Sequence, residues 1–430
     1  MSRLRPSRAE RVRIAPLAVR FTSARWIGGS TAGLDPQVVL LSLTSLVIML
    51  GSSIITPALP LYAREFGVTY AGAGMLVSAF AAGRLAFDYV GGELADRVSP
   101  RFLTTVGALV TAISAFLCAR ATSYTELVAY RVIEGIGSAF YVITIMAIFA
   151  RTVDAGRMGK SMGFYQSMIL LGVSFGPSIG GVIAELWGLR APFYAMSLFG
   201  VAVGVVTWSR VDREVRAAHE EHRARPPIAV VARHVNSRAF VYVLVLTFLV
   251  FAVRAGMRTN LIPLFGAERG GLSESSIGLI LSISAFANFV VLWHAGELID
   301  RRGRQRVALP TLAATGVLCG VFAWSPGFVN LLFAAAALGA ALGYLAPAPA
   351  AMVADLTPKE MLGAVIGVYR MAGDLGLLVG PVAFGFLATR YGFEAAFFAA
   401  AAGSFATLAI GLAVPETLAR TNIDRRKRDE

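Results

Sequence analysis

The sequence has few charged residues for its length. Of its 430 residues, 15% are charged and 56% are hydrophobic, whereas about 25% are charged in an average soluble domain. A soluble protein of this composition would lack the polar surface that keeps a chain in solution. The shortage of charge therefore excludes an ordinary soluble domain and predicts an integral membrane protein.

Cysteine and histidine are scarcer still, with two and four residues. Cys118 and Cys319 fall in apolar segments, so no disulfide framework is expected. His219 and His222 have three-residue spacing in a polar stretch, unlike the H-E-x-x-H pattern of zinc proteases. We therefore expect no metal and no cofactor. The sequence also lacks a G-x-x-x-x-G-K-[ST] loop, so we do not expect ATP to drive the protein directly.

Long apolar runs are abundant. A transmembrane helix needs about 20 mostly apolar residues, and twelve stretches of the sequence meet this requirement. They lie near residues 37–62, 71–93, 102–120, 124–150, 161–187, 191–209, 239–265, 275–298, 307–325, 328–354, 360–388 and 393–414.

The net charge of +13 is distributed unevenly between alternate loops. Basic residues gather before residue 35, in 97–101, 210–238 and 301–306, and after residue 415. The loops that alternate with these hold at most one arginine each, namely Arg64, Arg120, Arg190, Arg269 and Arg390. This asymmetry predicts that both termini and the middle loop are cytoplasmic, in a plasma (inner) membrane. No basic helix carries interleaved aromatic residues for base stacking, so nucleic acid is not an expected partner.

These features divide the chain into five regions. We expect a basic tail at 1–35, a six-helix bundle at 36–209, a cytoplasmic linker at 210–238, a second six-helix bundle at 239–414 and a basic tail at 415–430. The linker is expected to hold a short amphipathic helix around 212–223. For the first tail, contact with anionic lipid is favoured, and an organelle transit peptide of similar composition is the alternative.

The two predicted bundles are related by a sequence shift of 204 positions. The shift places Gly92-Glu-Leu-Ala-Asp96-Arg97 on Gly296-Glu-Leu-Ile-Asp300-Arg301. It also places Gly172, Gly176, Pro177 and Gly181 on Gly376, Gly380, Pro381 and Gly385. Six spans in each half, repeated in parallel, predict an all-α membrane protein made of two pseudo-two-fold-related bundles, with a site between them.

Three motifs extend this prediction to a family. The loop after the eighth span reads G-E-L-I-D-R-R-G-R-Q at 296–305, the fourth span contains R-V-I-E-G-I-G at 131–137, and the fifth contains G-V-S-F-G-P-S-I-G-G at 172–181. With these motifs the chain resembles the major facilitator superfamily, and the fifth-span motif resembles its proton-coupled drug and metabolite exporters. The resemblance implies that span two packs on span eleven and span five on span eight.

The fifth-span motif has a second interpretation, because G-V-S-F-G matches the G-x-S-x-G elbow of serine hydrolases. An elbow requires a strand before the serine, a helix after it and later acid and histidine residues. Ser174 instead lies inside an apolar segment, so we expect no enzyme. We expect the glycines to permit close helix packing and Pro177 to bend the helix. The residues assigned to this packing motif are Gly172, Gly176, Pro177, Gly180, Gly181, Gly376, Gly380 and Pro381.

The resemblance assigns the loop motif to a cytoplasmic gate. Its aspartates are expected to meet helix N-termini and arginines across the seam between the halves. The gate residues are Gly92, Asp96, Arg97, Arg101, Gly296, Asp300, Arg301, Gly303 and Arg304.

Ionisable residues inside predicted spans are costly and mark functional sites by default. Three arginines have a carboxylate three or four residues away, in the pairs Arg84 and Asp88, Arg131 and Glu134, and Arg370 and Asp374. Local neutralisation within each pair is one interpretation. We favour proton coupling by Asp374, Asp88, Glu134 and Arg131, beside a cavity or charge relay formed by Arg84, Arg370, Arg254, Gln166 and Asn288. Arg258 is expected to face outer lipid headgroups.

The sequence thus predicts a monomeric secondary transporter that exchanges protons for small amphipathic compounds and contacts lipid. The first span has no acidic residue, and the spans hold more arginines than acids. An organic-anion or lysolipid transporter of the same fold is therefore the alternative. A non-transporting receptor and a membrane hydrolase are less favoured.

Overall fold

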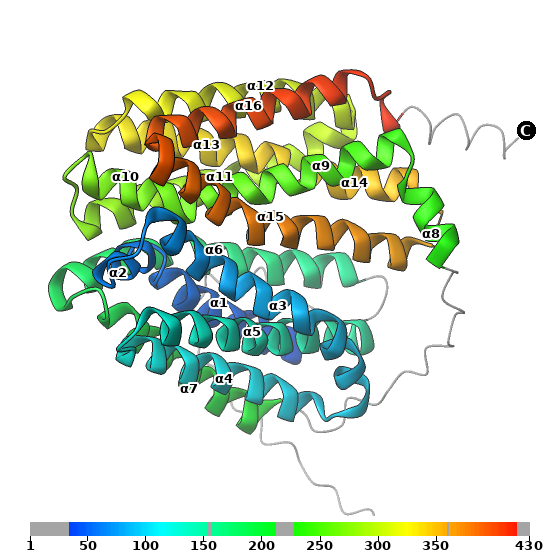
Figure 1. Cartoon of the computed structure of the whole chain (residues 1–430). Helices are drawn as coiled ribbons and strands as arrows, with labels where there is room; N and C mark the ends of the chain where they lie inside the picture. The colour runs from blue at the N-terminus through cyan, green and yellow to red at the C-terminus, as the bar shows by residue number, and fades with distance from the viewer. Residues whose placement is uncertain (1–33, 154–156, 212–227, 359–360, 419–430) are drawn as a thin grey trace, which may run out of the picture.

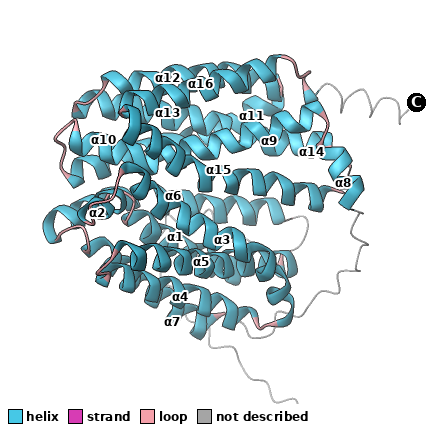
Figure 2. Ribbon diagram, in the orientation of Figure 1, coloured by secondary structure: helices cyan, strands magenta, loops and turns pink. Residues whose placement is uncertain are grey.

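The computed structural model describes residues 34–153, 157–211, 228–358 and 361–418. Every regular element in these residues is helical (Figure 2), and twelve segments are long and apolar enough to cross a membrane. The prediction of an all-α membrane protein with twelve spans is confirmed. The spans agree with the predicted ones to within a few residues at their ends. The linker helix expected at 212–223 lies outside the described residues.

The first half of the chain forms the lower bundle in Figure 1. Its helices are α1 (Pro36–Ile54), α2 (Leu59–Glu65), α3 (Tyr70–Arg97), α4 (Pro100–Arg120), α5 (Tyr124–Thr152), α6 (Met158–Trp187) and α7 (Ala191–Arg210). Helices α1 and α2 form a single span, interrupted by a turn that contains Pro57. Proline lacks the N–H that an uninterrupted helix would use there.

The second half forms the upper bundle in Figure 1. It contains α8 (Ile228–Val235), α9 (Arg238–Val253), the π-helix η1 (Arg254–Leu261), α10 (Ile262–Glu268), α11 (Glu274–Arg302), α12 (Arg304–Val321), the 3₁₀ turn η2 (Phe322–Trp324), α13 (Phe328–Leu345), α14 (Pro347–Leu356), α15 (Leu362–Tyr391) and α16 (Phe393–Leu412). Helices α9, η1 and α10 together make the seventh span.

The 204-residue repeat is visible in the helix bounds. Helix α6 starts at 158 and ends at 187, and α15 starts at 362 and ends at 391, 204 positions later at both ends. Helices α3 and α11 start at 70 and 274, again 204 apart. These four helices line the seam between the bundles, where α3 packs against α15 and α6 against α11. The pairing that the family resemblance implies is therefore present.

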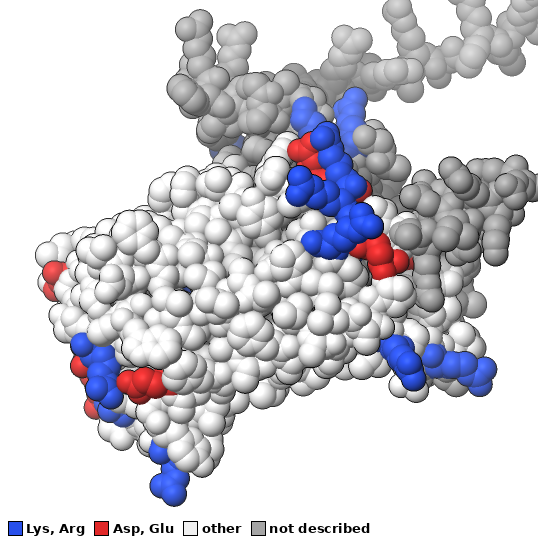
Figure 3. All heavy atoms as spheres, turned by 90° about the horizontal axis from the view of Figure 1, so that it is seen from above, with Lys and Arg blue, Asp and Glu red and all other residues white. Residues whose placement is uncertain are grey.

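On the face seen in Figure 3, charged residues gather at the two ends of the molecule, with a broad uncharged band between them. We call the end where Arg210 and Ile228 flank the linker the linker end, and the opposite end the far end. The described basic residues at the linker end are Arg101, Arg157, Lys160, Arg210, Arg233, Arg238, Arg301, Arg302, Arg304 and Arg306; those at the far end are Arg64, Arg120, Arg190, Arg269 and Arg390. The arginine-rich side predicted from the sequence is thus the linker end.

Candidate transport cavity and its gates

A cavity of about 190 Å³ lies at the seam between the two bundles. The first half contributes Ser52, Ile55, Thr56, Leu59, Val77, Phe80, Ala81, Arg131 and Glu134, and the second half contributes Arg254, Ala255, Thr259 and Leu377. The lining is mostly apolar, with a few charged and hydroxyl side chains. This composition is typical of a site for a small amphipathic molecule.

The fourth span brings a buried ion pair to the cavity. Arg131 Nη1 lies 2.7 Å from Glu134 Oε1, and the two side chains are 6% and 1% exposed. Arg131 Nε also donates to the Leu76 carbonyl at 3.2 Å, and the guanidinium lies over the Phe80 ring. The helical spacing of three residues makes this pairing possible. Arg131 is therefore neutralised by its own helix.

The seam between α3 and α15 has an antiparallel register that aligns two further arginines. Ser78 Oγ donates to the Leu378 carbonyl, and the Gly74 and Pro381 backbones approach closely. Continuing this register by about two turns places Arg84 level with Arg370. Both cations lie within electrostatic reach of Tyr165 on α6.

The other residues predicted for the seam are dispersed. Asp374 is half-buried on α15, whereas the side chain of Asp88 lies outside the described residues. Gln166 is exposed on α6 and Asn288 is half-buried on α11. The Asn288 backbone lies against Gly343 of α13 within the second half. The register therefore brings Arg84 and Arg370 to one level of the seam between α3 and α15, whereas the backbone of Asn288 packs on α13 of its own half.

The far end of the seam is closed by two backbone contacts that are related to each other by the 204-residue shift. A Cβ on Gly74 of α3 would lie 2.2 Å from the Pro381 carbonyl oxygen, and a Cβ on Gly278 of α11 would lie 2.3 Å from that of Pro177. Real Cβ atoms do not come so close, so both positions require glycine in this state. Gly74 and Gly278 are repeat mates that sequence analysis missed. The signal for them was their 204-residue separation.

The linker end of the same helices is open. A Cβ on Gly163 of α6, Gly296 of α11 or Gly367 of α15 would meet nothing within 4 Å. Gly74 and Gly278 thus contact the other half at the far end, whereas a Cβ on Gly163, Gly296 or Gly367 would contact neither half at the linker end. The structure shows a state that is closed at the far end and open at the linker end.

A polar latch crosses the far end between the halves. Arg64 of α2 lies 3.5 Å from Glu268 of α10, and the hydroxyl of Tyr70 on α3 donates to the same carboxylate. Ser275 N on α11 donates to Glu185 of α6 at 3.1 Å. None of these residues was assigned to a site by sequence analysis, although Arg64 and Glu268 are themselves separated by the 204 positions of the repeat.

Glu268→Gln is expected to loosen the far-end latch. The Arg64 and Glu268 side chains are 39% and 34% exposed, so the ion pair contributes at most about 1 kcal/mol. Its loss should shift the balance toward the far-open state by up to about fivefold. The measurement is the rate at which Ser275→Cys, in the seam, reacts with a membrane-impermeant maleimide.

Glu394→Gln is the matched control. Glu394 pairs with Arg269 at the same end, but both residues belong to the second half. This control should leave the labelling rate of Ser275→Cys unchanged. Equal labelling rates for the Glu268 and Glu394 variants would show that the pair of Arg64 and Glu268 does not help to keep the far end closed.

The second copy of the loop motif forms a network within its own half. Arg304 Nη1 lies 2.6 Å from Asp300, and Arg304 Nε donates to Asp355 of α14 at 3.0 Å. Arg301 pairs with Glu297. Asp300 therefore does not pair across the seam here, contrary to the sequence-based expectation. The open linker end explains this, because the halves are separated where Asp300 lies.

Glu416 completes that network, although sequence analysis did not single it out. Its carboxylate accepts backbone N–H groups of Arg304, Gln305 and Arg306 at 2.8 to 3.3 Å. These are the unpaired first donors of α12. Gly303 begins this helix with φ of 106°, a conformation that favours glycine. Gly303 and Arg304 thus fix the loop after α11.

The first copy of the motif is described only in part. The side chains of Gly92-to-Arg97, including Asp96, lie outside the described residues, as does any contact they make. Arg101 lies over the ring of Trp208 with its guanidinium carbon 4.8 Å from the ring centroid. This contact joins α4 to α7 within the first half.

The fifth-span motif packs helices on two sides. A Cβ on Gly172, Gly176 or Gly180 would lie within 2.6 Å of α1, so these glycines pack within the first half. Gly376 and Gly380 similarly face α9. Pro177 and Gly181 instead face α11 across the seam, and Pro381 faces α3.

Ser174 of the same motif makes an internal helix contact. Its hydroxyl donates to the Leu170 carbonyl one turn earlier, at 2.7 Å. It lies in the middle of α6, with no strand before it. The hydrolase interpretation therefore has no structural support.

The seventh span contains an eight-residue π-helix, Arg254–Leu261. Arg254 lines the seam cavity, and Arg258 is 9% exposed. The expectation that Arg258 faces outer headgroups was wrong. Arg258 is instead enclosed by the bundle, in the same π-helix as Arg254.

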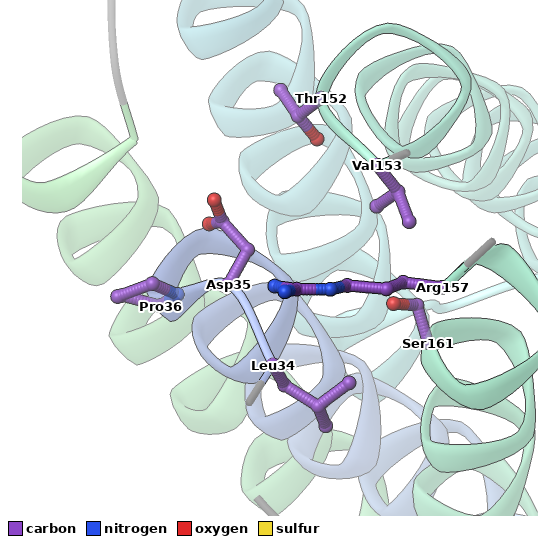
Figure 4. A pocket seen from close by; sticks show the side chains of 7 residues that line it. All are labelled: Leu34, Asp35, Pro36, Thr152, Val153, Arg157 and Ser161. Carbon is purple, nitrogen blue, oxygen red and sulfur yellow. The ribbon is translucent and has the colours of Figure 1, made fainter. Parts of the chain in front are cut away.

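A second pocket of about 300 Å³ lies at the linker end of the first half. Figure 4 shows Arg157 extending across it toward Asp35, with Thr152 and Ser161 nearby. Asp35 caps α1 by accepting the Gln37 N–H at 2.7 Å. Every lining residue belongs to the first half, so this larger pocket is not part of the path between the halves.

Comparison with known proteins agrees with this architecture. The family model described as Major Facilitator Superfamily matches residues 41–291 and 247–429. The chain belongs to the major facilitator superfamily. It is a multi-pass membrane transporter and not an enzyme.

Individual relatives are distant but extensive. An uncharacterised MFS-type transporter of Methanocaldococcus jannaschii is 22% identical over 361 residues, covering 84% of this chain and 93% of that protein. Multidrug resistance protein 2 of Bacillus subtilis is 24% identical over 357 residues, covering 81% and 88%. A bacterial homologue of the human lysosomal transporter Spinster, solved in an inward-facing and unoccupied conformation, superposes with a TM-score of 0.71 at 15% identity. The match covers 94% of this chain and 98% of that structure, and it shows the fold alone.

Proposed function

We propose that this superfamily member exports small amphipathic compounds in exchange for protons by alternating access. The observation that carries the proposal is a mostly apolar cavity between two bundles, closed at the far end and open at the linker end. Alternating access requires such a state and its opposite. The similarity to a multidrug resistance protein over most of both chains supports the direction and the substrate class.

The linker end is the cytoplasmic end in this proposal. It carries most of the described basic residues, and positive charge in short loops remains on the cytoplasmic side during insertion. The protein would then lie in the plasma (inner) membrane with both termini inside. The present state would take compounds from the cytoplasm and release them after the far-end contacts open.

Protons would act on the carboxylates beside the seam arginines. Asp374 lies one helical turn from Arg370 on α15, and Arg370 is level with Arg84 across the seam. Protonation of Asp374 or Asp88 would leave these like charges without compensation and favour separation of the halves. Glu134 is a second candidate, because its Oε2 is buried without a hydrogen-bond partner in the described residues.

The test is substrate-evoked proton movement in proteoliposomes under an imposed pH gradient. Ethidium and hexanesulfonate serve as an amphipathic cation and an amphipathic anion. We expect at least one to move protons in the wild type and Asp374→Asn to abolish that movement. Glu297→Gln, which breaks an exposed ion pair at the linker end, should behave as the wild type.

Two results would contradict the proposal. Transport of a compound without any proton movement would exclude proton exchange. Full proton-coupled transport by Asp374→Asn would show that Asp374 is not the coupling residue and would move the assignment to Glu134.

A further inference from the structure

Two arginines in the seventh span lack a counter-charge. Among the described residues, neither Arg254 nor Arg258 makes an ion pair or a hydrogen bond through its side chain. Each of the other arginines at the cavity or its gates that is as buried as Arg258, namely Arg131 and Arg304, binds a carboxylate. The two exceptions lie four residues apart in the same π-helix.

Their position makes the missing counter-charge costly. Arg258 is 9% exposed and within repulsive reach of Arg254. A buried, unpaired cation is strongly disfavoured relative to water, and a second cation beside it adds repulsion. A π-helical turn is itself less favourable than an α-helical turn and occurs frequently at functional sites. A ligand that supplies negative charge would offset both costs.

The cavity that Arg254 lines lacks an available acid. Its described lining holds one carboxylate, Glu134, which already binds Arg131. Arg254 is therefore the cation of the lining that remains unneutralised. The hydroxyls of Ser52, Thr56 and Thr259 lie in the same lining and can donate to an anion.

The remainder of the lining is apolar and defines the other part of the ligand. Phe80, Leu59, Val77 and Leu377 line the same cavity as Arg254. An anionic headgroup at Arg254 would place a short hydrocarbon portion against them. The cavity volume of about 190 Å³ limits an enclosed ligand to a small molecule.

We propose that Arg254 and Arg258 form the headgroup site for an amphipathic anion, which is the substrate class of this transporter. The inference rests on the proposed transport function and specifies the charge of its cargo. Carboxylate, sulfonate and phosphate headgroups share the required chemistry, because a guanidinium donates two parallel hydrogen bonds to each.

Equilibrium binding to the purified full-length protein tests the site without transport. The probes are hexanesulfonate, hexyl phosphate, hexanoate, hexyltrimethylammonium and hexanol, each measured by its shift of the melting temperature. We expect at least one anion to stabilise the wild type, with weaker binding at high salt. The cation and the alcohol should not stabilise it. The three anions distinguish the headgroups.

Substitutions then locate the binding site. Arg254→Gln should weaken anion binding at least about tenfold. In Arg258→Met, the new side chain is of similar length but carries no charge. This substitution should weaken anion binding. It should also raise the melting temperature of the ligand-free protein, because an uncompensated charge is removed. Arg120→Gln, an exposed arginine at the far end, should change neither quantity.

Several outcomes would overturn the inference. These are stabilisation by the cation alone, anion binding that Arg254→Gln leaves intact, and a ligand-free Arg258→Met that is less stable than the wild type. Proton-coupled transport of ethidium without anion binding would reject this inference while supporting the proposed function. Anion binding at Arg254 without any coupled proton movement would support this inference and contradict the proposed proton exchange.

Discussion

Gly278→Ala is expected to prevent closure of the far end and to reduce transport strongly. The new Cβ would lie 2.3 Å from the Pro177 carbonyl oxygen in the closed state. The atoms in its way are backbone, so α6 and α11 must separate by about 1 Å to restore ordinary contact. Overpacking of this kind costs about 1–3 kcal/mol, which corresponds to a shift of about 5- to 150-fold between two states.

The same effect is expected for Gly74→Ala, because Gly74 is the repeat mate of Gly278. Its Cβ would lie 2.2 Å from the Pro381 carbonyl oxygen and 2.9 Å from the Asn260 amide nitrogen. The substitution affects only the closed state, so folding of each half should be retained. Labelling of Ser275→Cys should accelerate in both variants while transport falls by at least about tenfold.

Gly367→Ala is the matched control for these glycines. Gly367 lies on a seam helix, but its Cβ would meet nothing within 4 Å because the linker end is open. We expect unchanged labelling at Ser275→Cys. If Gly278→Ala transported normally, the close backbone contact would have no role in the transport cycle.

Glu134→Gln is expected to have the largest effect on stability. It leaves Arg131 buried in the bundle with its counter-charge removed, and the loss of one partner from a buried ion pair costs about 3–5 kcal/mol. The Arg131 and Glu134 side chains are 6% and 1% exposed, so water cannot replace the lost carboxylate. We expect a markedly lower melting temperature and loss of proton-coupled transport.

A double replacement separates stability from function at this pair. Arg131→Leu combined with Glu134→Leu removes both charges, and such apolar replacements are often neutral or stabilising. We expect the double variant to recover the melting temperature of the wild type but not its transport. Wild-type stability of Glu134→Gln would show that the pair is accessible to water. Transport by the double variant would show that the pair is structural only.

Much of the architecture was predictable because the membrane imposes simple rules. Apolar runs of about 20 residues determine the spans, since lipid cannot hydrogen-bond an unpaired backbone. The family resemblance implied which helices meet at the seam, and these helices are related in the structure by the 204-residue shift of the repeat. The pairing of Arg131 with Glu134, which the structure shows, was one of the two interpretations of their spacing on one helix.

Side-chain partners across the seam were not predictable in this way. Across the seam, Glu268 meets Arg64 and Tyr70, and within the second half Glu416 meets the start of α12. The 204-residue repeat relates Arg64 to Glu268 but does not by itself show that the two side chains touch. Asp300 was assigned a partner across the seam, but its partner depends on which end of the molecule is open.

The sequence by itself determined the membrane class, the twelve spans, the repeat and the family, because these depend on composition and on distances along the chain. Only the tertiary structure decided which end is closed, which glycines contact a carbonyl of the other half, and which arginines lack a carboxylate. Arg258 illustrates the difference. It was expected to face outer lipid headgroups, but it is buried in a π-helix of the seventh span, where its charge has no counter-charge among the described residues.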